Sequence, residues 1–183
     1  MKVISGIYKG KEILVPKSGI RPTSDKVKQS IINILQPRLA GSRFLDLFAG
    51  TGAIGIEALS NGASFACFVE NNHKSYIILK KNLENIVADK SNYETIKHNA
   101  TQLVDLLISK NIEPFDIIFA DPFYDDISWI FDNLIALIEK FLKNDGVFIL
   151  EHRNKESFDY HKFFVEKRNY GDTTLSIFQK GQK

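Results

Sequence analysis

The sequence contains only one cysteine in 183 residues, and no apolar run approaches the roughly 20 residues that a membrane-spanning helix needs. Without a second cysteine, a disulfide within the chain is excluded, and the apolar neighbours of Cys67 favour a buried, inert thiol over a catalytic one. This cysteine usage fits a reducing compartment. Since no signal-peptide core follows Met1, we expect a soluble, cytoplasmic protein without membrane contacts.

Histidines are also few, and internal repeats and low-complexity linkers are lacking. No mutual spacing typical of a catalytic group or a metal site connects His73, His98, His152 and His161, so we expect no bound metal. A chain of 183 residues with 44% hydrophobic content is long enough for one well-cored domain and short for two. We expect a monomer with a single domain over 1–183, in which 1–20 form an N-terminal β-hairpin extension and 21–183 the core.

The net charge of +2 hides an asymmetry along the chain. Residues 1–43 carry nine Lys or Arg and two acids, a net +7, whereas 44–183 carry fifteen bases and twenty acids, a net −5. A solvated charged arm is one explanation. We favour the other, a basic surface beside an acidic catalytic body, because a nucleic-acid substrate requires such a surface.

The central feature of the sequence is a buried strand that ends on glycines and restarts as a helix, within residues 44–57. The run F-L-D-L-F predicts a strand buried on both faces, and the residues after Gly52 follow helical spacing. Gly50 and Gly52 lack the side chains that would keep a ligand from the backbone, and the new helix presents unpaired N–H groups and its positive end. This pattern predicts a nucleotide-binding turn.

The spacing of Gly50, Gly52 and Gly55 also fits the G-x-G-x-x-G turn of dinucleotide-binding enzymes. Asp46, inside the strand, favours a different ligand, because a pyrophosphate gains nothing from a negative charge. S-adenosylmethionine carries an amino group and a sulfonium, and D-x-F-x-G-x-G after a strand is similar to the signature of the methyltransferases that use it. Asp46 can alternatively close the turn by bonding to nearby backbone.

Downstream of this turn, strand and helix patterns alternate with little interruption. We expect strands at 65–70, 95–100, 115–120 and 146–151, helices at 74–87, 101–110 and 128–142, and an antiparallel hairpin at 163–170 and 173–179. Such alternation predicts an α/β fold with a mostly parallel sheet and a ligand at the carboxyl ends of the strands. The helix at 74–87 is expected to face inward with Ile77, Ile78, Leu83 and Ile86.

Another amphipathic helix is expected ahead of the glycine turn, after the rigid dipeptide Arg21-Pro22. Thr23 or Ser24 can act as its N-cap, so the helix start presents free N–H groups that suit a carboxylate such as that of methionine. Plain capping uses the same residues, and both interpretations stay open.

Polar residues are expected at the ends of the second and third predicted strands. Glu70 can accept from both hydroxyls of a ribose, which serves S-adenosylmethionine and NAD equally, or it is an exposed strand-end acid. Asn99 can accept from an adenine amino group while a backbone N–H contacts a ring nitrogen. Asn99 can instead cap the helix that follows it.

The fourth predicted strand ends in F-A-D-P-F-Y, residues 119–124. Methyl transfer to an exocyclic amine requires the nitrogen lone pair to leave conjugation with the base, which two acceptors for the N–H bonds promote. Asp121 supplies one acceptor and the Pro122 carbonyl a second, while Phe123 and Tyr124 offer faces for an unstacked base. The transfer is then an in-line displacement at the sulfonium methyl, favoured by orientation and electrostatics. Asp-Pro can also merely start a turn.

Asp121 also bears on the identity of the base. A carboxylate only accepts, and guanine presents N1–H and N2–H side by side, whereas adenine presents its amine beside an acceptor nitrogen. Asp121 therefore favours guanine N2, although look-alike adenine enzymes also carry an aspartate at this place.

Four blocks of the sequence together resemble the RsmD family of bacterial 16S rRNA guanine-N2 methyltransferases. They are V-I-S-G-I-Y-K-G, R-P-T-S-D-K-V-K-Q-S-I-I-N-I-L, F-L-D-L-F-A-G-T-G-A-I-G-I-E-A-L and F-A-D-P-F-Y. The likeness covers nearly the whole chain, including Y-G-D-T-T-L near its end. It implies a Rossmann-like class I methyltransferase with a seven-stranded, mostly parallel sheet and a C-terminal antiparallel hairpin. It also implies S-adenosylmethionine as cofactor and one guanine of the small ribosomal subunit as target.

By this resemblance, the cofactor and the guanine lie against residues of the same strand ends. The cofactor site comprises Thr23, Asp46, Phe48, Gly50, Thr51, Gly52, Glu70, Asn71, Asn99 and Ala100, and the guanine site Asp121, Pro122, Phe123 and Tyr124. The family pattern is D-P-P-[YF]. Phe123 in place of the second proline restores a backbone N–H and frees a φ angle, so the Pro122 acceptor is held less firmly.

The basic N-terminal region is expected to position RNA without reading bases. Residues 1–16 have the pattern of a short β-hairpin, with Gly6 and Gly10 as bends. Phosphate contacts are expected from Lys2, Lys9, Lys11, Arg21, Lys26 and Lys28. The hairpin lysines can instead protect an edge strand from aggregation.

Two other activities compete with methylation of rRNA guanine. One is an amino-methyltransferase that acts on DNA adenine or on a different RNA. The other is a nicotinamide-dependent oxidoreductase built on Gly50, Gly52 and Gly55, for which the sequence offers no candidate for hydride chemistry.

Overall fold

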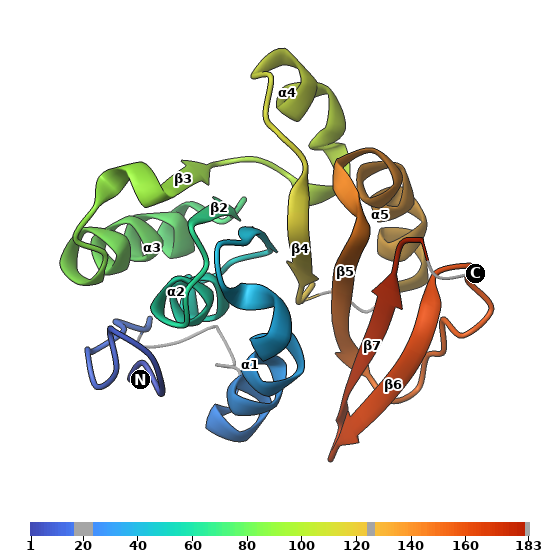
Figure 1. Cartoon of the computed structure of the whole chain (residues 1–183), viewed down its shortest axis with the longest axis horizontal. Helices are drawn as coiled ribbons and strands as arrows, with labels where there is room; N and C mark the ends of the chain where they lie inside the picture. Colours follow the sequence, from blue (N-terminus) through green and yellow to red (C-terminus); the bar gives the residue numbers. More distant parts are fainter. Residues whose placement is uncertain (17–23, 124–126, 182–183) are drawn as a thin grey trace.

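The computed structural model describes residues 1–16, 24–123 and 127–181 of the chain (Figure 1). A single seven-stranded sheet runs through the molecule in the order β3-β2-β1-β4-β5-β7-β6. The predictions for Arg21, Thr23 and Tyr124 concern positions outside the described residues.

Strands and helices follow one another along the chain much as the hydrophobic periodicity predicts. The strands are β1 Arg43–Leu47, β2 Phe65–Val69, β3 Tyr93–Ile96, β4 Phe115–Ala120, β5 Leu142–Arg153, β6 Phe164–Tyr170 and β7 Thr173–Gln179. The helices are α1 Asp25–Leu39, α2 Ala53–Ser60, α3 His73–Ile86, α4 Val104–Ser109 and α5 Ile127–Phe141, with short 3-10 turns η1 Lys90–Asn92 and η2 Ala100–Gln102.

The pairing of the strands places a topological switch point in the middle of the sheet. The five strands β3, β2, β1, β4 and β5 are parallel, whereas β7 runs antiparallel to β5 and β6 antiparallel to β7. The chain moves outward from β1 through β2 to β3 and then returns to β4 on the other side of β1. Ligands of such sheets bind outside the carboxyl ends of the strands at this point.

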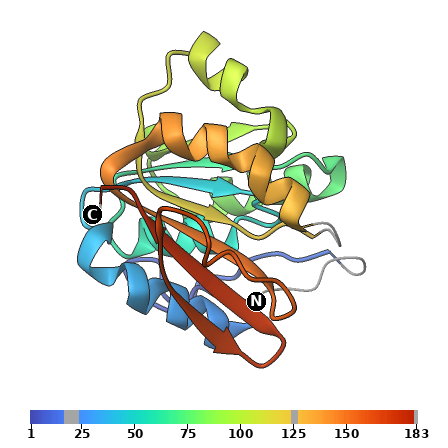
Figure 2. The same ribbon diagram turned by 90° about the vertical axis from the view of Figure 1, so that its right-hand side faces the viewer.

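Helices cover both faces of the sheet, and alternating side chains of each central strand enter two separate cores. In β4, Ile117 and Phe119 join the core beneath α1, α2 and α3, whereas Ile118 and Ala120 join the core beneath α4 and α5. Figure 2 shows α1 and α5 on opposite sides of the sheet. In β1, Phe44 enters the first core and Leu45 the second, so the prediction of a strand buried on both faces is confirmed.

The predictions for the third strand and for the inward face of α3 need correction. The third strand ends at Ile96 and not at residue 100, because the side chain of Asn99 caps a 3-10 turn and the chain has already left the sheet. In α3, Ile77 is 42% exposed and Leu79 is fully buried in its place. The inward stripe of this helix is Leu79, Leu83 and Ile86, which follow i, i+4, i+7 spacing.

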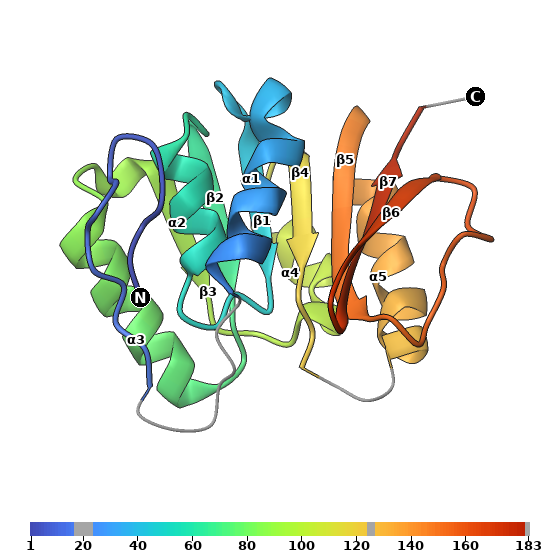
Figure 3. The same cartoon turned by 90° about the horizontal axis from the view of Figure 1, so that it is seen from below.

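The N-terminal segment, residues 1–16, is not the regular hairpin that its pattern predicts. In this segment the described residues form one isolated antiparallel bridge, between Lys2 and Glu12, and no strand. We call residues 1–16 the arm. It runs along α2 and α3 on the side away from the sheet (Figure 3), and all eight residues of α2 are buried.

Among the described residues, no helix has the length and apolar character that crossing a membrane would require.

Candidate functional site

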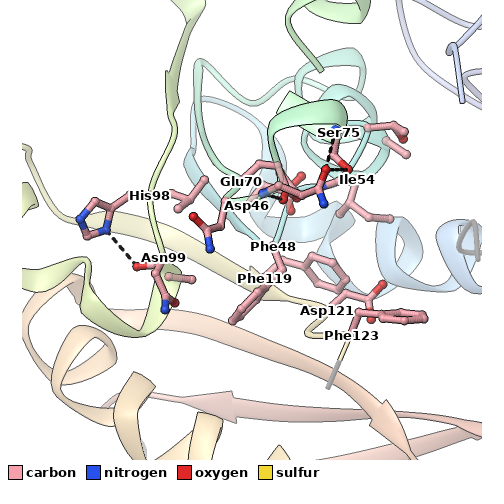
Figure 4. A pocket seen from close by; sticks show the side chains of 18 of the residues that line it. Asp46, Phe48, Ile54, Glu70, Ser75, His98, Asn99, Phe119, Asp121 and Phe123 are labelled. Carbon is pink, nitrogen blue, oxygen red and sulfur yellow. Dashed lines mark hydrogen bonds between the residues drawn. The ribbon is translucent and has the colours of Figure 1, made fainter. Parts of the chain in front are cut away.

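A pocket of about 360 Å³ opens at the switch point, beside the carboxyl ends of β1, β2 and β4. It collects predicted residues from four separate segments of the chain, including Asp46, Glu70, Asn99 and Asp121. Figure 4 shows His98 and Asn99 at one end of the pocket and Asp121 and Phe123 at the other. Other predicted residues that line it are Phe48, Gly50, Thr51, Asn71 and Ala100.

Asp46 is a buried acid beside the glycine turn. Its side chain is 2% exposed, and its carboxylate accepts a hydrogen bond from the Gly55 N–H at 2.9 Å. Burial raises the pKa of Asp46 to about 8, and the nearby charges of Asp121 and Glu70 add to the increase, against the Gly55 hydrogen bond. A cationic group in the pocket would stabilise the ionised form, so the site favours positive charge.

The glycine turn has the backbone that its sequence predicts. Gly50 and Gly52 have φ of 55° and 82°, in the left-handed region that favours glycine. Phe48, which lines the pocket, also has a positive φ of 60°, which is unusual for a bulky residue and occurs most often at functional sites. A Cβ on Gly55 would collide with the Phe68 ring, so this glycine lets α2 approach the sheet and Asp46.

Glu70 ties the end of β2 to the glycine turn. Its two carboxylate oxygens accept from the Gly50 N–H at 2.7 Å and from the Asn72 N–H at 2.6 Å. Each carboxylate oxygen has more than one lone pair, so these bonds still leave acceptor capacity for ribose hydroxyls. The ribose contact therefore stays a prediction, and Glu70 also stabilises the turn.

Asn99 has the capping role that was one of its two predicted roles. Its Oδ1 accepts from the Thr101 N–H at 3.1 Å and the Thr101 hydroxyl at 3.0 Å. The same Oδ1 is the predicted acceptor for the adenine amino group, so the adenine would have to share this oxygen with Thr101. Ala100 is buried in the pocket wall, and contact of both residues with adenine stays a prediction.

Asp121 and Phe123 form the end of the pocket next to β4. Asp46 pairs in register with Phe119 of β4, so Asp121 follows two residues later at the rim. Pro122 is buried and does not belong to the pocket lining, whereas Phe123 lines the pocket and is 77% exposed. This end of the pocket thus joins an acidic acceptor to an open aromatic face.

The predicted RNA contacts divide into exposed and buried side chains. Lys2, Lys9, Lys11 and Lys26 are exposed. Lys28 is fully buried, and its ammonium lies 3.0 Å from the Asp25 carboxylate and 3.6 Å from that of Glu57. The prediction that Lys28 binds RNA is therefore wrong.

Several pocket residues escaped the sequence argument. Asn72 caps α3 by accepting from the Lys74 and Ser75 N–H groups, and an asparagine just before a helical pattern could have indicated it. Ser75 and Ile54 also line the pocket, because each lies in the first turn of its helix, α3 or α2. Met1 also lines the pocket, and no sequence pattern could have placed it there because the arm returns to the site only in three dimensions.

Comparison with known proteins finds relatives over nearly the whole chain. A family model described as Conserved hypothetical protein 95 matches residues 1–179. YlbH of Bacillus subtilis is 34% identical over 186 residues, covering 98% of this chain and 99% of YlbH. A Buchnera aphidicola protein named Ribosomal RNA small subunit methyltransferase D is 33% identical over 158 residues, covering 85% of this chain and 79% of that protein.

Solved structures share the complete fold. A hypothetical protein of Thermus thermophilus has a TM-score of 0.82 at 26% identity, covering 97% of this chain and 98% of the other. The structure of yhhF from Escherichia coli has a TM-score of 0.80 at 25% identity, covering 100% and 99%. An O-methyltransferase of Bacillus cereus in complex with SAH is similar in fold alone, with a TM-score of 0.68 at 16% identity, covering 87% and 83%.

Proposed function

Since the chain belongs to the family described as Conserved hypothetical protein 95 and has a class I methyltransferase fold, we propose that it methylates the N2 amine of a guanine in 16S rRNA, with S-adenosylmethionine as donor. The observation that carries the proposal is the single pocket that Asp46 and Asp121 share. One acid suits the cationic donor and the other suits the amine that receives the methyl group.

The cofactor half of the proposal rests on charge and shape. S-adenosylmethionine supplies an electrophilic methyl group when bound, and its ammonium and sulfonium are cations. Asp46 is buried and close to two other acids, which favours a cation over the pyrophosphate of NAD. Glu70 stands where β2 ends and retains acceptor capacity for a ribose.

The acceptor half rests on Asp121, which lines the pocket. Asp121 would accept an N–H of the amine, so that the nitrogen lone pair turns toward the methyl group. The Pro122 carbonyl, proposed as the second acceptor, belongs to a buried residue outside the pocket lining. Orientation and electrostatic stabilisation then supply most of the rate, as expected for an in-line displacement. Phe123, at 77% exposure, offers a face on which an unstacked base can rest.

The relatives support ribosomal RNA as substrate. The Buchnera aphidicola relative is named as a methyltransferase of small-subunit ribosomal RNA, and so is an Escherichia coli relative that is 31% identical over 157 residues. The exposed lysines of the arm, Lys2, Lys9 and Lys11, would hold phosphates of the RNA. A carboxylate at position 121 favours guanine, whose N1–H and N2–H are adjacent donors.

The proposal is tested by methyl transfer from labelled S-adenosylmethionine into small ribosomal subunits that lack the modification. We expect the label in N2-methylguanosine after digestion to nucleosides. Label in N6-methyladenosine would favour the competing adenine activity, and the absence of transfer together with tighter binding of NAD would contradict the proposal.

Asp121→Ala should abolish this turnover while cofactor affinity changes by no more than a few fold. Loss of one acceptor in the reacting pocket lowers kcat by about 10²-fold or more. The exposed Asp132→Ala in α5 removes a carboxylate elsewhere and serves as control. Normal turnover by Asp121→Ala would refute the role of this acid.

A further inference from the structure

The arm is held by buried polar side chains of α2. The Glu57 carboxylate accepts from the Ile4 N–H at 2.7 Å, and the Ser60 hydroxyl accepts from the Tyr8 N–H at 2.9 Å. A Cβ on Gly6 would collide with the Ser60 carbonyl, so the arm and the helix are in close backbone contact there. These contacts give the arm one defined docked position.

One residue of α3 connects the docked arm directly to the glycine turn. The side chain of Asn82 is fully buried. Its Oδ1 accepts from the Leu14 N–H at 2.8 Å, and its Nδ2 donates to the Leu14 carbonyl at 3.0 Å and to the Thr51 carbonyl at 2.9 Å. Both amide hydrogens and the amide oxygen are thus used, and they join the arm to a pocket residue.

Two further contacts bring the same elements together. A Cβ on Gly52 would collide with Leu79, which lies one turn before Asn82 on the buried face of α3, so the glycine turn rests on this face. On the arm, the N–H of the fully buried Ile13 donates to the Met1 carbonyl at 2.8 Å, and Met1 lines the pocket. The arm therefore reaches the pocket by two routes, through Asn82 and through Met1.

We infer that Asn82 is a positioning residue that couples docking of the arm to binding of the methyl donor at the glycine turn. When the arm is docked, Asn82 holds the Thr51 carbonyl and so keeps the turn in the conformation that lines the pocket. A ligand that stabilises the turn must then stabilise the docked arm by the same free energy, because coupling between two sites is reciprocal. The identity of the ligand rests on the proposed function. By this coupling, the arm, whose lysines the proposed function assigns to RNA, responds to binding of the cofactor.

An aspartate at position 82 tests this coupling with little change in volume. In Asn82→Asp the carboxylate cannot donate, and it faces the carbonyls of Leu14 and Thr51. We expect the dissociation constant of S-adenosylhomocysteine, measured by calorimetry, to rise about tenfold, as expected when buried carbonyls lose their donor. Asn85→Asp, on an exposed position of the same helix, is the matched control and should bind like wild type.

Hydrogen exchange supplies a readout that a merely structural role would not change. In wild type and Asn85→Asp, S-adenosylhomocysteine should slow exchange of the Leu14 and Ile13 amides, although both belong to the arm. In Asn82→Asp this protection should be lost while circular dichroism still shows a folded chain. Equal affinities of the two variants, or arm amides in wild type that exchange at the same rate with and without ligand, would overturn the inference.

The outcome is separable from that of the proposed function. The comparison between the two variants requires no RNA, whereas the labelled-methyl experiment identifies the modified base in wild type alone. Methylation of guanine with equal behaviour of the two variants would leave the proposed function intact and refute the coupling.

Discussion

At the scale of single residues, the site depends on an acid whose burial and neighbours oppose its ionisation. Asp46 has a pKa raised to about 8 by burial and by the charges of Asp121 and Glu70. At pH 7 its carboxyl is therefore largely protonated in the free protein. A cationic ligand reverses this preference because it stabilises the carboxylate, so the ligand and the proton compete for the same group.

Binding of S-adenosylmethionine at pH 7 should consequently release a proton from Asp46. The ligand's amino group remains largely charged there, because an α-amino group ordinarily has a pKa of about 7.7–8.0. Calorimetry in two buffers with different ionisation enthalpies should give different binding enthalpies for wild type. Asp46→Asn, which cannot ionise, should show equal enthalpies and weaker binding. Equal enthalpies for wild type would show that Asp46 does not titrate with the ligand.

At the scale of elements, the C-terminal strands and the loop before β6 pack through two histidines, His152 and His161, whose pKa burial lowers. His152 of β5 contacts Ser176 of β7 through Nε2 at 2.8 Å, and the His161 ring stands edge-on to Phe131 with centroids 5.4 Å apart. Burial lowers the pKa of both histidines, as the first of several causes. Protonation of either ring would place a charge within the aromatic packing between α5 and the last strands.

These histidines should make the fold less stable as the pH falls. The unfolded chain takes up protons near the ordinary histidine pKa of about 6.5, while the folded chain resists them until a lower pH, so stability decreases with falling pH through this window. Asp46 acts in the opposite direction because its pKa is raised. Asp46 is present in both wild type and the double variant His152→Gln, His161→Gln. The difference in pH dependence between these two proteins therefore isolates the contribution of the histidines.

Urea unfolding at pH 7.5 and pH 5.5 measures this effect. From pH 7.5 to pH 5.5, the free energy of unfolding should change less favourably for wild type than for the double variant, because only wild type carries the two histidines. The exposed His73→Gln serves as control and should behave like wild type. If the double variant showed the same pH dependence as wild type, the histidines would have no part in it.

At the scale of the whole molecule, charge is distributed so that the arm is basic and the pocket acidic. Lys2 and Lys9 are exposed on the arm, whereas Lys28 is buried with Glu57 and donates to the Lys2 carbonyl at 3.0 Å. Removing one partner of a buried pair leaves an uncompensated charge. Lys28 therefore belongs to the framework that holds the arm, and the exposed lysines are the candidates for RNA.

Replacing Lys2 and Lys9 together with glutamine should weaken binding to small ribosomal subunits at low salt. It should also reduce the slope of log affinity against log salt by up to about two, since each lost phosphate contact removes about one counterion. Lys90→Gln with Lys140→Gln removes the same charge from other exposed positions and should leave the slope unchanged. An unaltered slope in the arm variant would show that its lysines do not touch phosphate.

The three acids that line the pocket share one property. Glu70 and Asp121 follow the last residue of their strands and Asp46 is the penultimate residue of β1, and parallel pairing brings such positions together whatever the details of packing. The errors have a different character. The third strand ends earlier than its pattern predicts because a capping Asn99 competes with strand continuation. Ile77 faces outward against the prediction because an apolar residue at the edge of a helical stripe can face either way.

The sequence by itself determined the alternation of strands and helices, the glycine turn and the acids that surround it, because period, turn chemistry and buried-strand composition are properties of neighbouring residues. Only the tertiary structure decided that Lys28 is buried, that Met1 reaches the pocket and that Asn82 joins Leu14 to Thr51. These outcomes depend on contacts between segments far apart in the chain, and no local pattern records which segment will cover a given helix.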